Sequence, residues 1–313
     1  MDIRKLELKD INQNDERFRT SYFLGLEKMI QSLDKEGVIN PLLVTVRDNK
    51  NTLVTGWKRF LACKQISMSP VPVSMIENED DLKTFLIGFY ENWATREFNI
   101  IEKAEILKKL KLFGEKEKEI VKTFLPLLGM NKNMMYYDLY LKIAEFSPEV
   151  KEAIVEKEIS FSIAQLLVHF NSKQRKYLLP LISSAGKNKQ KEILEYLEEI
   201  SKRESVTVDE IFEWQEIKAV MDSPQLTFIQ KANKLRDVLK KKKYPRLMAR
   251  KKAFDQTLKK LNIQEDITVQ PSMYFEEEGI NVSFSVKNKT ELLEKVDKIK
   301  EMASRKEFPE LFE

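Results

Sequence analysis

The first hundred residues alternate between helical and extended hydrophobic patterns. Apolar side chains recur at helical spacing from Leu26 to Leu33, and Gly37 follows as a residue suited to end a helix. Apolar runs on either side of a polar turn then predict two strands, and a helix and a third strand follow: 42–46, 52–55, 57–65 and 71–76. This order predicts a small mixed α/β domain over residues 1–100.

From residue 99 onward the apolar pattern is almost entirely helical. Asn99 followed three residues later by Glu102 is the signature of a capping box, so a helix is expected to begin there. Further helices are expected at about 117–128, 132–145, 148–156, 160–169, 172–184, 187–201, 207–221 and 225–240. Residues 101–205 are therefore expected to form an all-helical domain.

The last hundred residues change character. The alternating runs 267–269 and 280–286 predict two strands, and a helix is expected at about 289–303. Residues 206–313 are thus expected to combine a basic helical segment with a small strand–helix unit. The whole chain is expected to be an α+β protein of three parts.

Cysteine and histidine usage excludes several classes of site. The chain contains one cysteine, Cys63, and one histidine, His169, which excludes a disulfide framework, a Cys-rich zinc site and a multi-histidine metal centre. Cys63 is expected to be a small core residue and His169 a structural one. The N-terminus lacks an apolar signal core, and no run of about 18 uncharged apolar residues occurs, so a cytoplasmic protein without a membrane span is expected.

Positive charge is concentrated in one segment. Residues 231–260 hold 13 Lys or Arg and 2 Asp, a local charge of +11 in a chain whose total is +4, so the remainder carries −7. Such local basicity is typical of contact with nucleic acid or an acidic membrane, and it equally fits a solvated helix face. The candidates for DNA contact in this run are Lys241, Lys242, Lys243 and Arg246.

A glycine lies between the second predicted strand and the helix at 57–65. Gly56 lets the backbone approach a ligand there, and the free N–H groups of the helix N-terminus favour an anion. Lys58 and Arg59 add cations where the helix dipole disfavours them, which suggests a compensating anion such as phosphate. The alternative is a plain surface turn.

A second polar group occurs at residues 91–97. Glu91 and Asn92 place a carboxylate beside an amide, and oxygen atoms of this kind can hold Mg²⁺ together with water and phosphate. Arg96 can bind a phosphate in bidentate fashion. The alternative is a helix end with ordinary ion pairs.

Residues 119–141 have the outline of a helix-turn-helix, with Gly129 in the turn and the second helix beginning at about Asn131. Residues at the start of such a helix meet bases or phosphates, and here they are Lys132, Asn133, Tyr136 and Tyr137. Pro126 is expected to kink or end the first helix. The alternative is a plain helical bundle with both tyrosines in its core.

The order of these motifs resembles the ParB/Spo0J family. The matching runs are Arg17 or Arg19, then Gly37-Val38-Ile39-Asn40-Pro41-Leu42-Leu43-Val44, Gly56-Trp57-Lys58-Arg59-Phe60-Leu61-Ala62, Glu91-Asn92 through Arg96, and Asn99-Ile100-Ile101-Glu102-Lys103-Ala104. The resemblance covers about residues 4–110, and the helix-turn-helix region is similar to that of the same family.

The resemblance implies CTP and Mg²⁺ as cofactors. Gly56 and Arg59 would then bind phosphates, and Glu91 and Asn92 would lie near the metal and the triphosphate. This chain has Trp57 where the family has a glutamate, and loss of that carboxylate puts CTP hydrolysis in doubt. No catalytic residue is assigned, and at most a weak CTPase is expected.

Three functions follow from these observations. The first is a DNA-binding protein in chromosome or plasmid partition or gene regulation, which responds to CTP–Mg²⁺, binds double-stranded DNA as a homodimer beside a ParA-type ATPase, and is associated with the nucleoid or a plasmid rather than a membrane. The second is a degenerate adaptor that binds protein partners only. The third is a kinase or phosphotransferase of the same fold.

Overall fold

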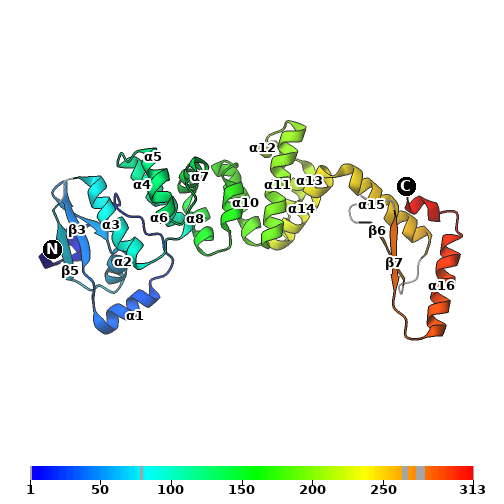
Figure 1. Ribbon diagram of the computed structural model, residues 1–313, viewed down its shortest axis with the longest axis horizontal. Helices are drawn as coiled ribbons and strands as arrows, with labels where there is room; N and C mark the ends of the chain where they lie inside the picture. Colours follow the sequence, from blue (N-terminus) through cyan, green and yellow to red (C-terminus); the bar gives the residue numbers. More distant parts are fainter. Residues whose placement is uncertain (1, 78–79, 263–266, 273–278, 313) are drawn as a thin grey trace. The chain divides into compact units, whose positions relative to one another are not determined.

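The computed structural model describes residues 2–77, 80–262, 267–272 and 279–312. The chain divides into two compact units. The first consists of Met1–Glu195 with Ser223–Asn233, and the second of Tyr196–Asp222 with Lys234–Glu313. Figure 1 labels the helices and strands in chain order. The division into domains at 1–100, 101–205 and 206–313 stays a prediction.

A five-stranded sheet begins the first unit, with strand order β1-β5-β3-β4-β2. Its strands are β1 (Asp2–Leu6), β2 (Ile11–Asn12), β3 (Leu42–Arg47), β4 (Lys50–Thr55) and β5 (Val71–Ile76), and the 3-10 turn η1 (Leu8–Asp10) lies between the first two. β3 pairs with β4 antiparallel and with β5 parallel, while β1 joins β5 antiparallel and β2 joins β4 parallel. The three predicted strands are confirmed, and β1 and β2 were not predicted.

The hairpin between β3 and β4 turns through two residues with positive φ. Asp48 has φ 50° and Asn49 has φ 57°. A two-residue turn with positive φ at both positions has a backbone twist that matches the twist of paired strands. Asp and Asn adopt positive φ more readily than most other residues. The turn therefore sets the register that carries β4 to its end at Thr55.

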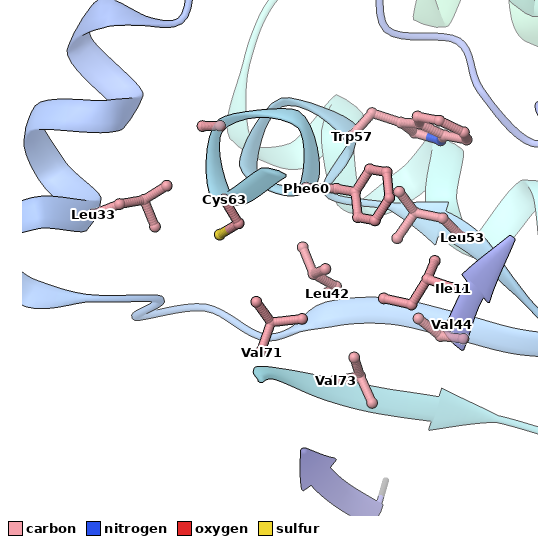
Figure 2. Close-up of a cluster of buried hydrophobic side chains, with 11 residues drawn as sticks. Ile11, Leu33, Leu42, Val44, Leu53, Trp57, Phe60, Cys63, Val71 and Val73 are labelled. Atoms are coloured by element: carbon pink, nitrogen blue, oxygen red, sulfur yellow. The ribbon is translucent and has the colours of Figure 1, made fainter. Parts of the chain in front are cut away.

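Helices α1 (Glu27–Glu36) and α2 (Trp57–Gln65) pack on one face of this sheet. Figure 2 shows Phe60 and Cys63 of α2 directed toward Leu42 and Val71 of the strands. Cys63 is completely buried, and this burial raises the pKa of its thiol. The prediction that Cys63 is a core residue is confirmed.

The next two helices are α3 (Asp81–Thr95) and α4 (Ile100–Leu112). The polar residues 78–81 predict an N-cap for α3, and Asp80 provides it by accepting from the Lys83 N–H. Residues 78 and 79 lie outside the described residues. The capping box at the start of α4 is confirmed, because Asn99 accepts from the Glu102 N–H and Glu102 accepts from the Asn99 N–H.

The first helix of the expected helix-turn-helix is irregular. It runs through α5 (Glu117–Glu119), the π-helical turn η2 (Ile120–Phe124) and α6 (Leu125–Leu127). Pro126 lacks an N–H and in a regular α-helix would clash with the carbonyl four residues earlier. That residue, Lys122, lies in the wider π turn. The Gly129 N–H then bonds the Pro126 oxygen and the Met130 N–H bonds the Leu125 oxygen, both at 2.9 Å, which is a Schellman ending with Gly129 at φ 73°.

The second helix of this region, α7 (Met134–Ala144), begins later than predicted. The side chain of Asn133 accepts from the Met135 N–H at 2.9 Å, so Asn133 is the N-cap rather than a residue inside the helix. α7 packs against α4. The helices that follow are α8 (Pro148–Val155), α9 (Phe161–Leu167), α10 (Ser172–Ser183) and α11 (Lys187–Glu204).

The next helices along the chain are α12 (Val208–Phe212), α13 (Gln215–Met221), α14 (Phe228–Lys243) and α15 (Pro245–Lys260). One helix was predicted at 207–221, but Trp214 is in an extended conformation as the N-cap of α13 and divides it into two. The helix α15 was not predicted. No helix among the described residues is long and apolar enough to cross a membrane.

The second unit ends in the expected strand–helix arrangement. β6 (Ile267–Pro271) pairs antiparallel with β7 (Ile280–Phe284), and α16 (Lys289–Ala303) and the 3-10 turn η4 (Phe308–Leu311) follow. Phe254 of α15 and Met302 of α16 share a small apolar core with the strands. The expected α+β fold with a small C-terminal strand–helix unit is confirmed.

Candidate functional site

A pocket of about 490 Å³ lies in the first unit, beside the N-terminus of α2. All six residues predicted to bind a nucleotide line it: Gly56, Lys58, Arg59, Glu91, Asn92 and Arg96. They come from the β4–α2 turn and from the end of α3, which are far apart in the sequence. The fold therefore brings the two predicted motifs to one place.

Gly56 supplies the conformation on which the pocket depends. It is the N-cap of α2 and lies in the left-handed region, with φ 95° and ψ 16°. A Cβ at this position would lie 2.7 Å from Leu42 Cδ2, so only glycine fits without a shift of the core. Residues of the first turn of α2 line the pocket, and free N–H groups at such a helix start would stabilise an anion.

The two cations after Gly56 have different surroundings. Arg59 donates through Nη1 to the backbone oxygens of Asn40 and Pro41, the latter at 2.9 Å. Burial lowers the pKa of the Arg59 guanidinium from its usual value, and the Glu91 carboxylate opposes this shift. Lys58 lies with Nζ 5.5 Å from the centroid of the Phe23 ring. Lys58 is thus the cation that a ligand reaches without displacing a backbone acceptor.

Trp57 belongs to the core as much as to the pocket. It is 2% exposed, it meets the Phe60 ring edge-on at 6.1 Å, and the Arg19 guanidinium lies 5.0 Å from its centroid. Its Nε1 is buried and has no hydrogen-bond partner in the described part of the chain. Figure 2 shows the indole beside Phe60 and Leu53. This position therefore supplies an apolar wall and no carboxylate.

Glu91 and Asn92 occupy the last turn of α3. One oxygen of the Glu91 carboxylate accepts from the Thr55 hydroxyl, whereas the Asn92 oxygen accepts from Arg96 Nε at 3.0 Å. No group of three or more His, Cys, Asp or Glu that could hold a metal occurs in the described ranges. Carboxylate and amide oxygens suit Mg²⁺, which takes few protein ligands when phosphates and water complete its shell. Glu91 fits this role directly, and Asn92 fits it once Arg96 moves.

Arg96 and the segment before α1 form the remaining wall. Arg96 Nη1 donates to the buried carboxylate of Glu102 at 2.8 Å. Glu102 also accepts from the Tyr22 N–H at 3.2 Å, and Asn99 donates to the Tyr22 oxygen at 2.7 Å. Ser21, Tyr22 and Phe23 line the pocket, and sequence reasoning missed them because their segment has no periodic pattern. Glu102 was expected only as a capping residue.

The residues predicted to read DNA are not equivalent in the structure. Lys132 and Asn133 are exposed and Tyr136 is half-buried, but Tyr137 is completely buried in the core. Tyr137 therefore has no surface to offer DNA, in agreement with the bundle alternative for this residue. The Asn133 oxygen caps α7, so bidentate pairing with adenine would break the cap. The exposed side chains of the first turn also include Met134 and Met135, which were not predicted.

The basic run also separates into two kinds of residue. Lys242 pairs with Glu216 at 3.0 Å, and Lys243 pairs with Glu199 at 2.7 Å while lying 4.6 Å from the centroid of Tyr196. Lys241 and Arg246 are exposed. The latter two are therefore the better placed for contact with a phosphate backbone.

Parts of the chain are similar to known proteins. Residues 1–93 match the ParB N-terminal domain. A probable chromosome-partitioning protein ParB of Borreliella burgdorferi is 25% identical over 198 residues, which are 63% of this chain and 73% of that protein. A nucleoid occlusion protein of Halalkalibacterium halodurans is 25% identical over 169 residues, which are 53% of this chain and 57% of that protein.

Solved structures include a C-terminally truncated ParB of Caulobacter crescentus complexed with CTP-γ-S. The match has 21% identity and a TM-score of 0.28, and it covers 55% of this chain and 94% of that chain. The chain therefore carries a ParB N-terminal domain at residues 1–93 and is similar in sequence to ParB proteins.

Proposed function

We propose that this chain is a DNA-binding protein of chromosome or plasmid partition, or of gene regulation, which responds to CTP with Mg²⁺. The observation that supports this most strongly is the convergence of all six predicted nucleotide-binding residues on one pocket. The names of the sequence relatives, a chromosome-partitioning protein and a nucleoid occlusion protein, support a role on DNA. A homodimer, a ParA-type ATPase partner and association with a nucleoid or plasmid belong to the same proposal.

Each wall of the pocket would bind a different part of CTP–Mg²⁺. The N–H groups at the start of α2, with Lys58 and Arg59, would bind phosphate oxygens. Mg²⁺ would be held by Glu91 and would neutralise the phosphates. Arg96 would reach the phosphates only by giving up an acceptor on Asn92 or Glu102. Because Trp57 supplies no carboxylate to activate water, binding is expected with little or no hydrolysis.

Calorimetry tests the nucleotide part of the proposal. The intact protein is titrated with CTP, ATP and GTP, with and without Mg²⁺ and duplex DNA. CTP with Mg²⁺ should bind, and Arg59→Ala or Asn92→Ala should each weaken binding by about tenfold or more. The first removes a charge-assisted contact with phosphate, and the second removes the amide oxygen beside the metal. Arg4→Ala, at an exposed position on β1, is the matched control and should bind as wild type. Absence of nucleotide binding by the intact protein would contradict the proposal.

The DNA part is tested separately, by duplex binding over a range of salt concentrations. The slope of log affinity against log salt should fall by about one for each phosphate contact removed. Lys132→Ala, Lys241→Ala and Arg246→Ala should each reduce it. Lys242→Ala should reduce it less than its neighbour Lys241→Ala, because Lys242 is paired with Glu216. A slope that no basic substitution changes would contradict DNA binding through these residues.

An adaptor without ligands is the second candidate. The observation that favours it is that Arg59 and Arg96 already donate to protein acceptors, so the pocket's guanidinium groups are satisfied internally. A protein that binds neither nucleotide nor duplex DNA at low salt would support this candidate. Turnover of nucleotide with a small hydroxyl acceptor would instead support a phosphotransferase with Glu91 as the base.

A further inference from the structure

The residue immediately before the Gly56 turn makes a contact that no motif predicted. Thr55 ends β4, is 4% exposed, and donates its hydroxyl to Oε2 of Glu91 at 2.5 Å. Glu91 itself is exposed to the pocket. A buried hydroxyl therefore fixes the carboxylate that we assign to Mg²⁺.

The methyl group of Thr55 is as constrained as its hydroxyl. A Cβ placed on Gly88 of α3 would lie 2.8 Å from Thr55 Cγ2, so α3 approaches β4 closely at this point. Gly88 and Glu91 are three residues apart and lie on the same face of α3. The methyl group of Thr55 thus faces Gly88 while its hydroxyl bonds Glu91. A β-branched side chain has few other rotamers, so these two contacts hold the hydroxyl in one orientation.

This contact joins the two walls of the pocket. Thr55 is adjacent to Gly56, whose turn is assigned to phosphate, and its hydroxyl holds the Glu91 carboxylate. Metal ligands are commonly oriented by hydrogen bonds from groups behind them, and loss of such a group weakens metal binding. We propose that Thr55 is a positioning residue for Glu91, which sets the place of Mg²⁺ relative to the phosphate turn. This inference rests on the proposed CTP–Mg²⁺ function.

The test compares Thr55→Val, which keeps the shape and removes the hydroxyl, with Thr55→Ser, which keeps the hydroxyl. CTP binding to the full chain is measured by calorimetry in EDTA and over a Mg²⁺ titration. In Thr55→Val, the Mg²⁺ concentration that gives half of the maximal increase in CTP affinity should rise by about tenfold. This factor corresponds to the loss of one hydrogen bond to a charged group. CTP affinity in EDTA should be unchanged, and Thr55→Ser should bind Mg²⁺–CTP nearly as wild type.

A double-mutant cycle separates the positioning of Glu91 from a general effect of Thr55→Val on folding. In a Glu91→Gln background, Thr55→Val should add no further change in Mg²⁺ dependence, because the carboxylate that it positions is gone. A Thr55→Val protein with wild-type Mg²⁺ dependence would overturn the inference. Equal loss of affinity with and without Mg²⁺ would do the same, since it indicates a purely structural role. Failure of the wild type to bind CTP at all would instead remove the proposed function on which the inference depends.

Discussion

Arg96 at the end of α3 donates to the buried carboxylate of Glu102 in the first turn of α4, with Nη1 and Oε2 2.8 Å apart. The exposed fraction of the Glu102 side chain is 4% and that of Arg96 is 34%. The Glu102 carboxylate therefore has little access to water and relies on Arg96 for compensation of its charge, whereas the guanidinium is still partly hydrated. The pair therefore joins a wall of the candidate pocket to the helical part of the first unit.

Replacement of Glu102 by glutamine should destabilise the protein. Glu102→Gln keeps the size of the side chain but removes the charge that pairs with Arg96 and accepts from the Asn99 and Tyr22 N–H groups. The free energy of unfolding should fall by about 1–3 kcal/mol, as for hydrogen bonds to a charged group. Urea unfolding measures it, with Glu36→Gln on the exposed end of α1 as control. Equal stability of the two variants would contradict the assigned role.

Gly88, inside α3, should not tolerate a methyl group. A Cβ there would lie 2.8 Å from Thr55 Cγ2 and 3.2 Å from Val54 Cγ1, so Gly88→Ala should push α3 away from β4. Overpacking of this kind costs about 1–3 kcal/mol, which exceeds the gain in helix propensity. Gly186→Ala, at the residue directly before α11, is the control, because nothing lies within 4 Å of its added Cβ. Thermal unfolding should separate the two variants.

Tyr137→Phe should stabilise the protein. The Tyr137 hydroxyl is buried and has no hydrogen-bond partner among the described residues, so its removal should raise the free energy of unfolding by about 1 kcal/mol. DNA affinity should not change, because the side chain is in the core. Tyr136→Phe, at a half-buried neighbour, is the control. A drop in DNA affinity specific to Tyr137→Phe would mean that the side chain leaves the core on binding.

Lys109 should make stability depend on pH above neutrality. Burial lowers the pKa of its ammonium from 10.5 to about 8, although Glu105 and Glu16 oppose the shift. Between these values the unfolded chain holds the proton and the folded chain has lost it, so this group raises the free energy of unfolding as pH increases from about 8 to about 10.5. Below pH 8 both states are protonated and this dependence ends.

Lys109→Met should remove that rise, whereas Lys28→Met on the exposed face of α1 should leave it in place. Urea unfolding at several pH values from 7 to 10 in the three proteins measures the difference. An identical pH profile for wild type and Lys109→Met would contradict the assignment.

The sequence predicted the parts of the fold that have a strong local pattern. The helix at 57–65 and the strand at 71–76 have the bounds of α2 and β5, because a left-handed glycine and a β-rich run define their ends. The two-residue strand β2 was missed because it is too short to show a period, and its place depends on β4. The helix α15 was missed because its basic residues suggested a charged surface run.

The candidate site was predicted only where its residues belong to motifs. Glu91 and Arg59 were found by their chemistry and spacing, and they line the same pocket. Thr55 was not found, because a threonine at a strand end acquires a role only from the helix that packs over it. The burial of Tyr137 likewise depends on how α7 packs against α4, which helical spacing alone does not reveal.

The irregular segment before α1 is held to α4 through its main chain. Lys109 donates to the oxygens of Glu16 and Arg17, and the N–H and oxygen of Tyr22 bind Glu102 and Asn99. Every residue type has the same main-chain oxygen, and every residue except proline has the same N–H. Exchanges of the Glu16 or Tyr22 side chain are therefore expected to leave these main-chain bonds in place. Phe18, which is buried, and Arg17, which pairs with Asp15 and Asp81, are the positions of the segment whose side chains should matter.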